Sequence, residues 1–130
     1  MDEIELGRAR AAISNEMTRL HREYYGRGPN KARTYIQDDL VAVVLQETFT
    51  RAERTLIDRG EVDAIQQIRR RFQQQMADEF TALVEQATGR KVRAFLSETN
   101  LEADVSVEIF LLADGRTDMA AFETDAETAT

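Results

Sequence analysis

Apolar residues along this chain switch between the spacing of a helix and that of a strand, and the switches constrain its fold most strongly. Over residues 3–25, apolar residues recur every three or four positions, which is typical of an amphipathic helix. They are Leu6, Ala9, Ile13, Met17, Leu20 and Tyr24. Gly26 and Pro29 then predict that this helix ends.

Two pairs of segments have the composition and spacing of β-hairpins. Residues 34–37 and 40–46 are rich in strand-forming residues and flank Asp38 and Asp39, which predict a tight turn. Residues 92–97 and 105–112 form the second pair. In the last segment Val105, Val107, Ile109 and Leu111 alternate with polar Ser106 and Glu108. This alternation indicates a strand with one buried face, to which we assign the apolar residues.

Two further helices are predicted between the hairpins, over residues 50–59 and 61–88. Thr50 and Glu53 have the spacing of a capping box, and Gly60 and Gly89 follow the two helices. The predicted order is α-β-β-α-α-β-β. It defines an α+β fold, a four-stranded antiparallel sheet of two hairpins with the helices packed mainly on one face. We assign residues 1–113 to one domain, a size that can bury its own core, and the acidic residues 114–130 to a disordered tail.

Composition excludes several classes of function. The chain has no cysteine and a single histidine, His21, so no thiolate site or histidine-rich metal site is expected. Neither a catalytic triad nor a glycine-rich nucleotide loop is present, so we predict a non-enzymatic protein without metal or cofactor. The net charge of -7 disfavours nucleic-acid binding. Without a membrane-spanning run of about 18 apolar residues or an apolar leader, the predicted location is cytoplasmic.

The most distinctive segment is the basic, tyrosine-containing stretch around GRGPNKAR. The candidate contact residues for an anion or a partner protein are Arg27, Lys31 and Arg33, with Tyr25 and Asp38 nearby. A structural interpretation remains open, in which Gly26 and Pro29 end the helix and the arginines bind its last carbonyl groups. The segment also follows a helix C-terminus, where the helix dipole repels anions.

The apolar stripe of the first helix allows two interpretations. Ile13, Met17 and Leu20 can pack on the chain's own sheet, or they can form a seam with a second copy in a homodimer. Arg69 falls within the apolar arc of the long helix, where an unpaired charge is costly. Arg69 can therefore lie at the margin of the core and extend its charged group to solvent, or it can pair with a carboxylate. If that carboxylate belongs to a second copy, Arg69 is an interface residue as well.

Residues 12–112 resemble the MpsC-type family of small bacterial and archaeal proteins. The resemblance is carried by GRGP with the following Lys31-Ala32-Arg33, by TRAERTL, by RRRFQQQM and by Thr88-Gly89-Arg90-Lys91-Val92. It implies a soluble accessory protein of a sodium-translocating, membrane-potential-generating system that is linked to bicarbonate transport, held at the membrane by a transporter subunit. The resemblance carries no established catalytic residues.

The resemblance leads to the hypothesis of a homodimeric accessory protein that uses the GRGPNKAR loop as its contact surface. The alternative, from a different class, is a sensor that binds a small anion or a nucleotide through the same basic loop. RNA binding is a weaker third hypothesis, because no RNA-binding motif accompanies the acidic net charge.

Overall fold

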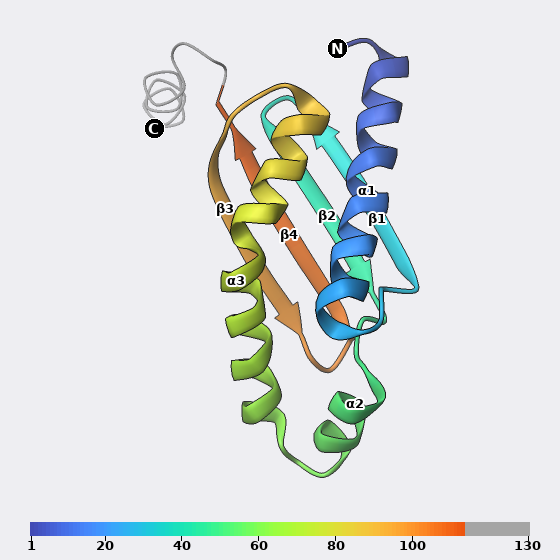
Figure 1. Ribbon diagram of the computed structural model, residues 1–130, viewed down its shortest axis with the longest axis vertical. Coiled ribbons are helices and arrows are strands. Elements are labelled where there is room, and N and C mark those ends of the chain that lie inside the picture. The colour runs from blue at the N-terminus through green and yellow to red at the C-terminus, as the bar shows by residue number, and fades with distance from the viewer. Residues whose placement is uncertain (114–130) are drawn as a thin grey trace, which may run out of the picture.

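The computed structural model describes residues 1–113, which fold into one layer of helices on one four-stranded sheet (Figure 1). The elements follow the predicted order, and the predicted α+β fold is confirmed. They are α1 (Glu3–Tyr25), β1 (Lys31–Gln37), β2 (Leu40–Gln46), α2 (Arg51–Asp58), α3 (Val62–Thr88), β3 (Val92–Asn100) and β4 (Val105–Leu112). The predicted tail, residues 114–130, lies outside the described residues.

Local sequence explains where the helices begin and end. Asp2 caps α1 by accepting a hydrogen bond from the Glu5 backbone N–H at 2.8 Å. Thr50 and Glu53 form the predicted capping box at the start of α2. Gly26 and Gly89 end α1 and α3 in the left-handed conformation, with φ angles of 79° and 70°. Glycine adopts this conformation without the steric cost that a Cβ imposes.

The sheet joins the two hairpins through their inner strands. Its order is β1-β2-β4-β3, and every neighbouring pair is antiparallel. Two strands are longer than predicted: β1 starts at Lys31, which pairs with Gln46, and β3 runs on to Asn100, which pairs with Val105. Apart from Thr99, these ends lack strand-forming residues, so their pairing depends on the neighbouring strand.

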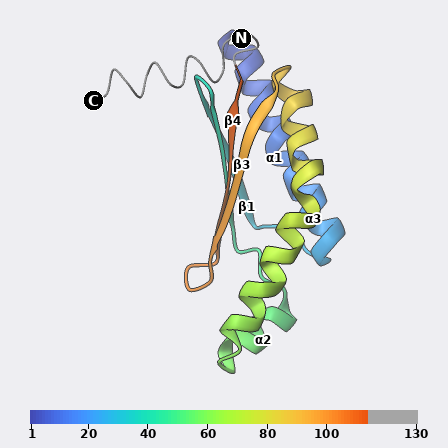
Figure 2. The same cartoon turned by 90° about the vertical axis from the view of Figure 1, so that its left-hand side faces the viewer.

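The helices α1 and α3 cover one face of the sheet, and no helix of residues 1–113 lies on the opposite face (Figure 2). The main core lies between these layers. It is formed by Ile13, Met17, Leu20, Val41, Val43, Leu45, Met76, Phe80, Val84, Phe110 and Leu112. The apolar stripe of α1 therefore packs on the chain's own sheet, and Ile13, Met17 and Leu20 are at most 3% exposed. Of the two interpretations of this stripe, the structure matches the core one.

The assignment of the buried face of β4 from sequence is wrong. Ser106, Glu108, Phe110 and Leu112 face the helices, whereas the alternating set from Val105 to Leu111 is only partly buried on the opposite face. Side chains alternate with a period of two, so burying Phe110 and Leu112 in the core places Ser106 and Glu108 on the same side. The large apolar side chains at the end of the strand thus decide its orientation.

Candidate functional site

The five predicted contact residues do not form one site. Lys31 and Arg33 are exposed on the face of β1 that the helices leave uncovered. Arg27 lies in the loop before β1, and Asp38 lies in the turn after it, at the opposite end of the strand. Tyr25 points into the core at the end of α1, where its ring lies 4.7 Å from that of Phe72. The basic segment is therefore spread over the whole length of the sheet.

Arg27 has a structural contact that the sequence did not specify. Its guanidinium donates hydrogen bonds to the Phe49 backbone carbonyl at 2.6 Å and to Asn30 Oδ1 at 3.0 Å. Phe49 lies just before Thr50, the N-cap of α2, so Arg27 connects the loop after α1 to the segment that leads into α2. A guanidinium has five N–H donors, and Arg27 is exposed, so these bonds hold the loop and leave donors available at the surface.

A buried ion pair occupies the space between α2, α3 and the end of the sheet. Arg69 is 2% exposed and donates two hydrogen bonds of 2.6 Å to the two carboxylate oxygens of Glu53. It also donates to the Thr48 hydroxyl and to the Thr48 carbonyl, each at 3.1 Å. The guanidinium carbon lies 4.1 Å from the centre of the Tyr25 ring. Of the predicted alternatives for Arg69, the structure matches a carboxylate partner, and that partner lies in the same chain.

The pair extends into a network that includes Asp104, in the turn between β3 and β4. Asp104 accepts hydrogen bonds from the Thr48 backbone N–H at 2.9 Å and from the Arg54 guanidinium at 3.2 Å. Its backbone carbonyl accepts a bond from the Glu47 N–H at 2.9 Å. These contacts connect both hairpins to α2 and α3. Since the charged groups bind one another, the network serves the fold.

Protonation of this region is set by burial and by the Arg69 pair. Burial alone would raise the pKa of Glu53, but hydrogen bonds from Arg69 and Thr50 outweigh it and hold the pKa below its usual value. Burial lowers the pKa of His21 to about 4, and its Nδ1 lies 3.0 Å from the Met17 carbonyl oxygen. Burial raises the pKa of Tyr25 to about 12. His21 and Tyr25 therefore both stay neutral at neutral pH.

Glu108 is the one described carboxyl group whose pKa burial raises to about 7. It is 1% exposed, and its Oε2 atom has no hydrogen-bond partner among residues 1–113. Ser97 is its neighbour on β3 and lines a hollow of about 310 Å³ between β3 and α3. Sequence reasoning missed Glu108 because it placed this side chain on the other face. The apolar run from Ile109 to Leu112 could have indicated that Phe110 and Leu112, and with them Glu108, face the helices.

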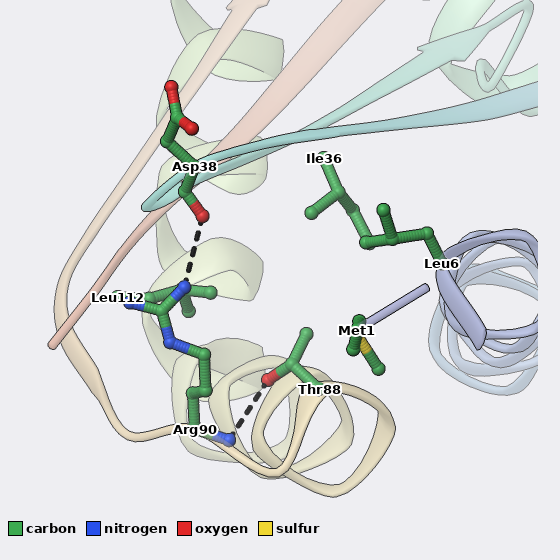
Figure 3. A pocket seen from close by; sticks show the side chains of 7 residues that line it. All are labelled: Met1, Leu6, Ile36, Asp38, Thr88, Arg90 and Leu112. Atoms are coloured by element: carbon green, nitrogen blue, oxygen red, sulfur yellow. Dashed lines mark hydrogen bonds between the residues drawn. The ribbon is translucent and has the colours of Figure 1, made fainter. Parts of the chain in front are cut away.

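A second hollow of about 310 Å³ lies at the other end of the sheet, between α1, the β1–β2 turn and the end of α3 (Figure 3). Arg90 reaches across it to the turn, where it donates hydrogen bonds to the Asp38 carbonyl at 3.0 Å and to Asp39 Oδ1 at 2.6 Å. It also donates to the Ala113 carbonyl at 3.0 Å. The rest of the lining is mostly apolar, with Met1, Leu6, Ile36 and Leu112. The arginine here holds three chain segments together.

The described part of the chain has neither a cluster of metal ligands nor a membrane-spanning helix. Within residues 1–113, no three histidine or acidic side chains lie close enough together to hold a metal ion. No helix in that same range has the length and apolar character needed to cross a bilayer. Residues 1–113 have two further exposed features, the uncovered face of the sheet and a group of cations at the end where β1 begins.

That group of cations, here called the basic end, consists of Arg22, Arg27, Lys31 and Arg51. All four side chains are exposed. They come from the last turn of α1, the following loop, the start of β1 and the start of α2. The Arg27 bond to Phe49 brings the loop next to α2. In a chain of net charge -7, the basic end is a local surface suited to an acidic partner.

Comparison with known proteins gives one match. The family model described as "Na+-translocating membrane potential-generating system (MpsC)" matches residues 6–114, which confirms the resemblance seen in the sequence. Neither a curated protein nor a solved structure matches the chain.

Proposed function

Since the chain belongs to the MpsC family, we propose that it is a non-catalytic accessory component of a sodium-translocating, membrane-potential-generating system. It acts by binding a protein subunit of that system, and it is held in the cytoplasm at the membrane surface through this contact. The family match over residues 6–114 is the observation that carries the proposal.

The state of the ionisable groups supports a binding role. The guanidinium groups of Arg69 and Arg90 are committed to hydrogen bonds within the chain. His21 has a pKa of about 4 and Tyr25 a pKa of about 12, and a general acid or base works best when its pKa is near the working pH. His21 and Tyr25 are therefore poorly suited to proton transfer at neutral pH, and Glu108, whose pKa of about 7 would suit it, is only 1% exposed.

We assign the partner contact to the basic end, which contains two of the residues expected from the sequence, Arg27 and Lys31. Its four exposed cations can bind carboxylates on an acidic face of a partner subunit, and the charge also steers association. Lys31 and Arg51 have exposed side chains, so changing them leaves the structural bonds of Arg27 in place.

The test is capture of membrane proteins by the tagged protein from detergent-solubilised membranes of the source organism, with mass spectrometry to identify them. The wild type should recover a transporter subunit of the sodium system. A Lys31→Glu/Arg51→Glu variant should lose it. Lys91→Glu is the matched control, because Lys91 is exposed at the opposite end of the sheet. Recovery of no transporter subunit by the wild type would refute the proposal.

The alternative, an anion or nucleotide sensor, is favoured by a narrower observation. Lys31 and Arg33 lie two residues apart on the same face of β1 and, with Tyr35, Val44 and Gln46, line a hollow of about 220 Å³. A ligand that binds only the folded state raises the melting temperature. Bicarbonate, phosphate and ATP should each be tested on the wild type and on Lys31→Ala. A rise seen only with the wild type would support this alternative.

A further inference from the structure

The face of the sheet opposite the helices is apolar at its centre and uncovered within the described part of the chain (Figure 2). Leu40, Ala42 and Val44 of β2 lie beside Val107, Ile109 and Leu111 of β4 on this face. Three large side chains on it are strongly exposed: Tyr35 at 49%, Leu40 at 41% and Leu96 at 57%. A contiguous apolar surface of this kind is typical of an interaction site.

The register of the four strands places opposite charges at the two ends of one row across this face. The row runs Arg33, Val44, Val107, Glu98, in the order β1, β2, β4, β3. Its two ends lie three strand spacings apart, about 14 Å. Arg33 is exposed and lies 5.5 Å above the Tyr35 ring, and Glu98 is exposed as well. The charges are therefore at the rim, with valines between them.

The next row repeats this arrangement with apolar ends. It runs Tyr35, Ala42, Ile109, Leu96 across the same four strands. Its small and medium side chains are central, and its large exposed ones stand at the two edges. Each row thus presents ends that complement each other, a cation with an anion or an aromatic ring with a leucine.

We infer that this face binds the same face of a second copy, with a two-fold axis parallel to the strands. Such an axis places β1 of one copy over β3 of the other, and it sets each row opposite the same row of the second copy. Arg33 then lies over Glu98 of the second copy, and Tyr35 lies over Leu96 of the second copy. A two-fold axis across the strands, through the middle of the face, would instead set Glu98 against Leu96 of the second copy.

The size and shape of the face fit a modest dimer. Four strands of seven residues cover about 19 Å by 24 Å. The flat area of this face is about 450 Å² on each copy, without the extra area that protruding side chains add. The total of about 900 Å² lies below the roughly 1,200 Å² at which stable specific interfaces begin, so association should be weak and depend on concentration. Two such sheets pack about 10 Å apart. The helices then lie on the two outer sides, and of the four residues of the basic end only Lys31 lies on the contact face, at its margin.

The experiment is sedimentation equilibrium of the full chain over about 1–200 µM, with circular dichroism to verify folding. The wild type should approach twice the monomer mass. Leu96→Glu should weaken the dimer at least about 100-fold, because it inserts a charge into the apolar contact on both copies. Ile4→Glu is the matched control. Ile4 is an exposed apolar residue on α1, 68% exposed, and its replacement should leave the dimer unchanged.

Charge reversal tests the orientation of the two copies. Arg33→Glu and Glu98→Arg should each weaken the dimer about 10-fold, because each creates two pairs of like charges. The double variant should recover most of the wild-type association. The two positions are too far apart within one chain to pair, so such a recovery can come only from contact between copies. A wild type that stays monomeric at 200 µM would overturn the inference, and so would a dimer that survives Leu96→Glu or a double variant that is no better than the single ones. These outcomes do not depend on capture of a transporter subunit.

Discussion

Replacing Arg69 with methionine should cost the protein about 3–5 kcal/mol of its free energy of unfolding. Removing one member of a buried ion pair leaves the other as an uncompensated charge, and the cost is typically of this size. Here the remaining carboxylate, Glu53, is 7% exposed. It would keep its hydrogen bonds from Thr50 but lose both bonds of 2.6 Å from the guanidinium. Methionine is a flexible apolar replacement for the stem of the arginine.

A double-mutant cycle separates this cost from the loss of packing. Glu53→Gln removes the negative charge and keeps an oxygen that can serve the capping box with Thr50. The double variant Arg69→Met/Glu53→Gln has no unpaired charge in this region. Its cost should be smaller than the sum of the two single costs by at least about 2 kcal/mol.

Urea unfolding followed by circular dichroism at pH 7 provides the measurement. The lowered pKa of Glu53 means that the pair stabilises the protein fully above 4.5, the usual value of this group, and that this stabilisation is lost as the pH falls. At pH 7 the cycle therefore reports the complete pair. The Arg69→Met melting temperature should fall by about 10–15 °C. Single costs that add to within about 0.5 kcal/mol would refute the reasoning.

Three other positions give independent predictions. The folded protein holds the Glu108 proton up to a pKa of about 7, so the contribution of this group to stability should fall as the pH rises from 4.5 through 7. The lowered pKa of His21 has the opposite effect between about 4 and 6.5, so the Glu108 contribution is read from the difference between variant and wild type. Relative to the wild type, Glu108→Gln should gain about 2–3 kcal/mol between pH 5 and pH 8 in urea unfolding, and a gain independent of pH would contradict this. Gly7→Ala should stabilise α1 by about 0.5–1 kcal/mol, since the added Cβ has space around it. Gly28→Ala should destabilise the fold by about 1 kcal/mol, because its Cβ would lie 3.1 Å from the Thr18 carbonyl oxygen. Thermal unfolding in which Gly28→Ala is more stable than Gly7→Ala would contradict both glycine predictions.

The sequence by itself determined the order of the elements and the points where the helices end. Gly26 and Gly89 stop α1 and α3, and Thr50 with Glu53 starts α2, in the structure as in the prediction. Helix caps and stops depend on residues within a few positions of each other, so local sequence is sufficient. The family was also recognisable from its motifs, since residues 6–114 match its model.

Only the tertiary structure decided which side of each element is buried and which groups meet. Both faces of β4 carry apolar residues, so its orientation depended on the helices packing over Phe110 and Leu112. The partner of Arg69 lies 16 residues earlier, and α2 must fold against α3 before Glu53 can reach it. The uncovered face exists because α1 and α3 share one side of the sheet. The alternation of residues along a strand shows which residues share a face, but the packing of distant elements determines which of the two faces is buried.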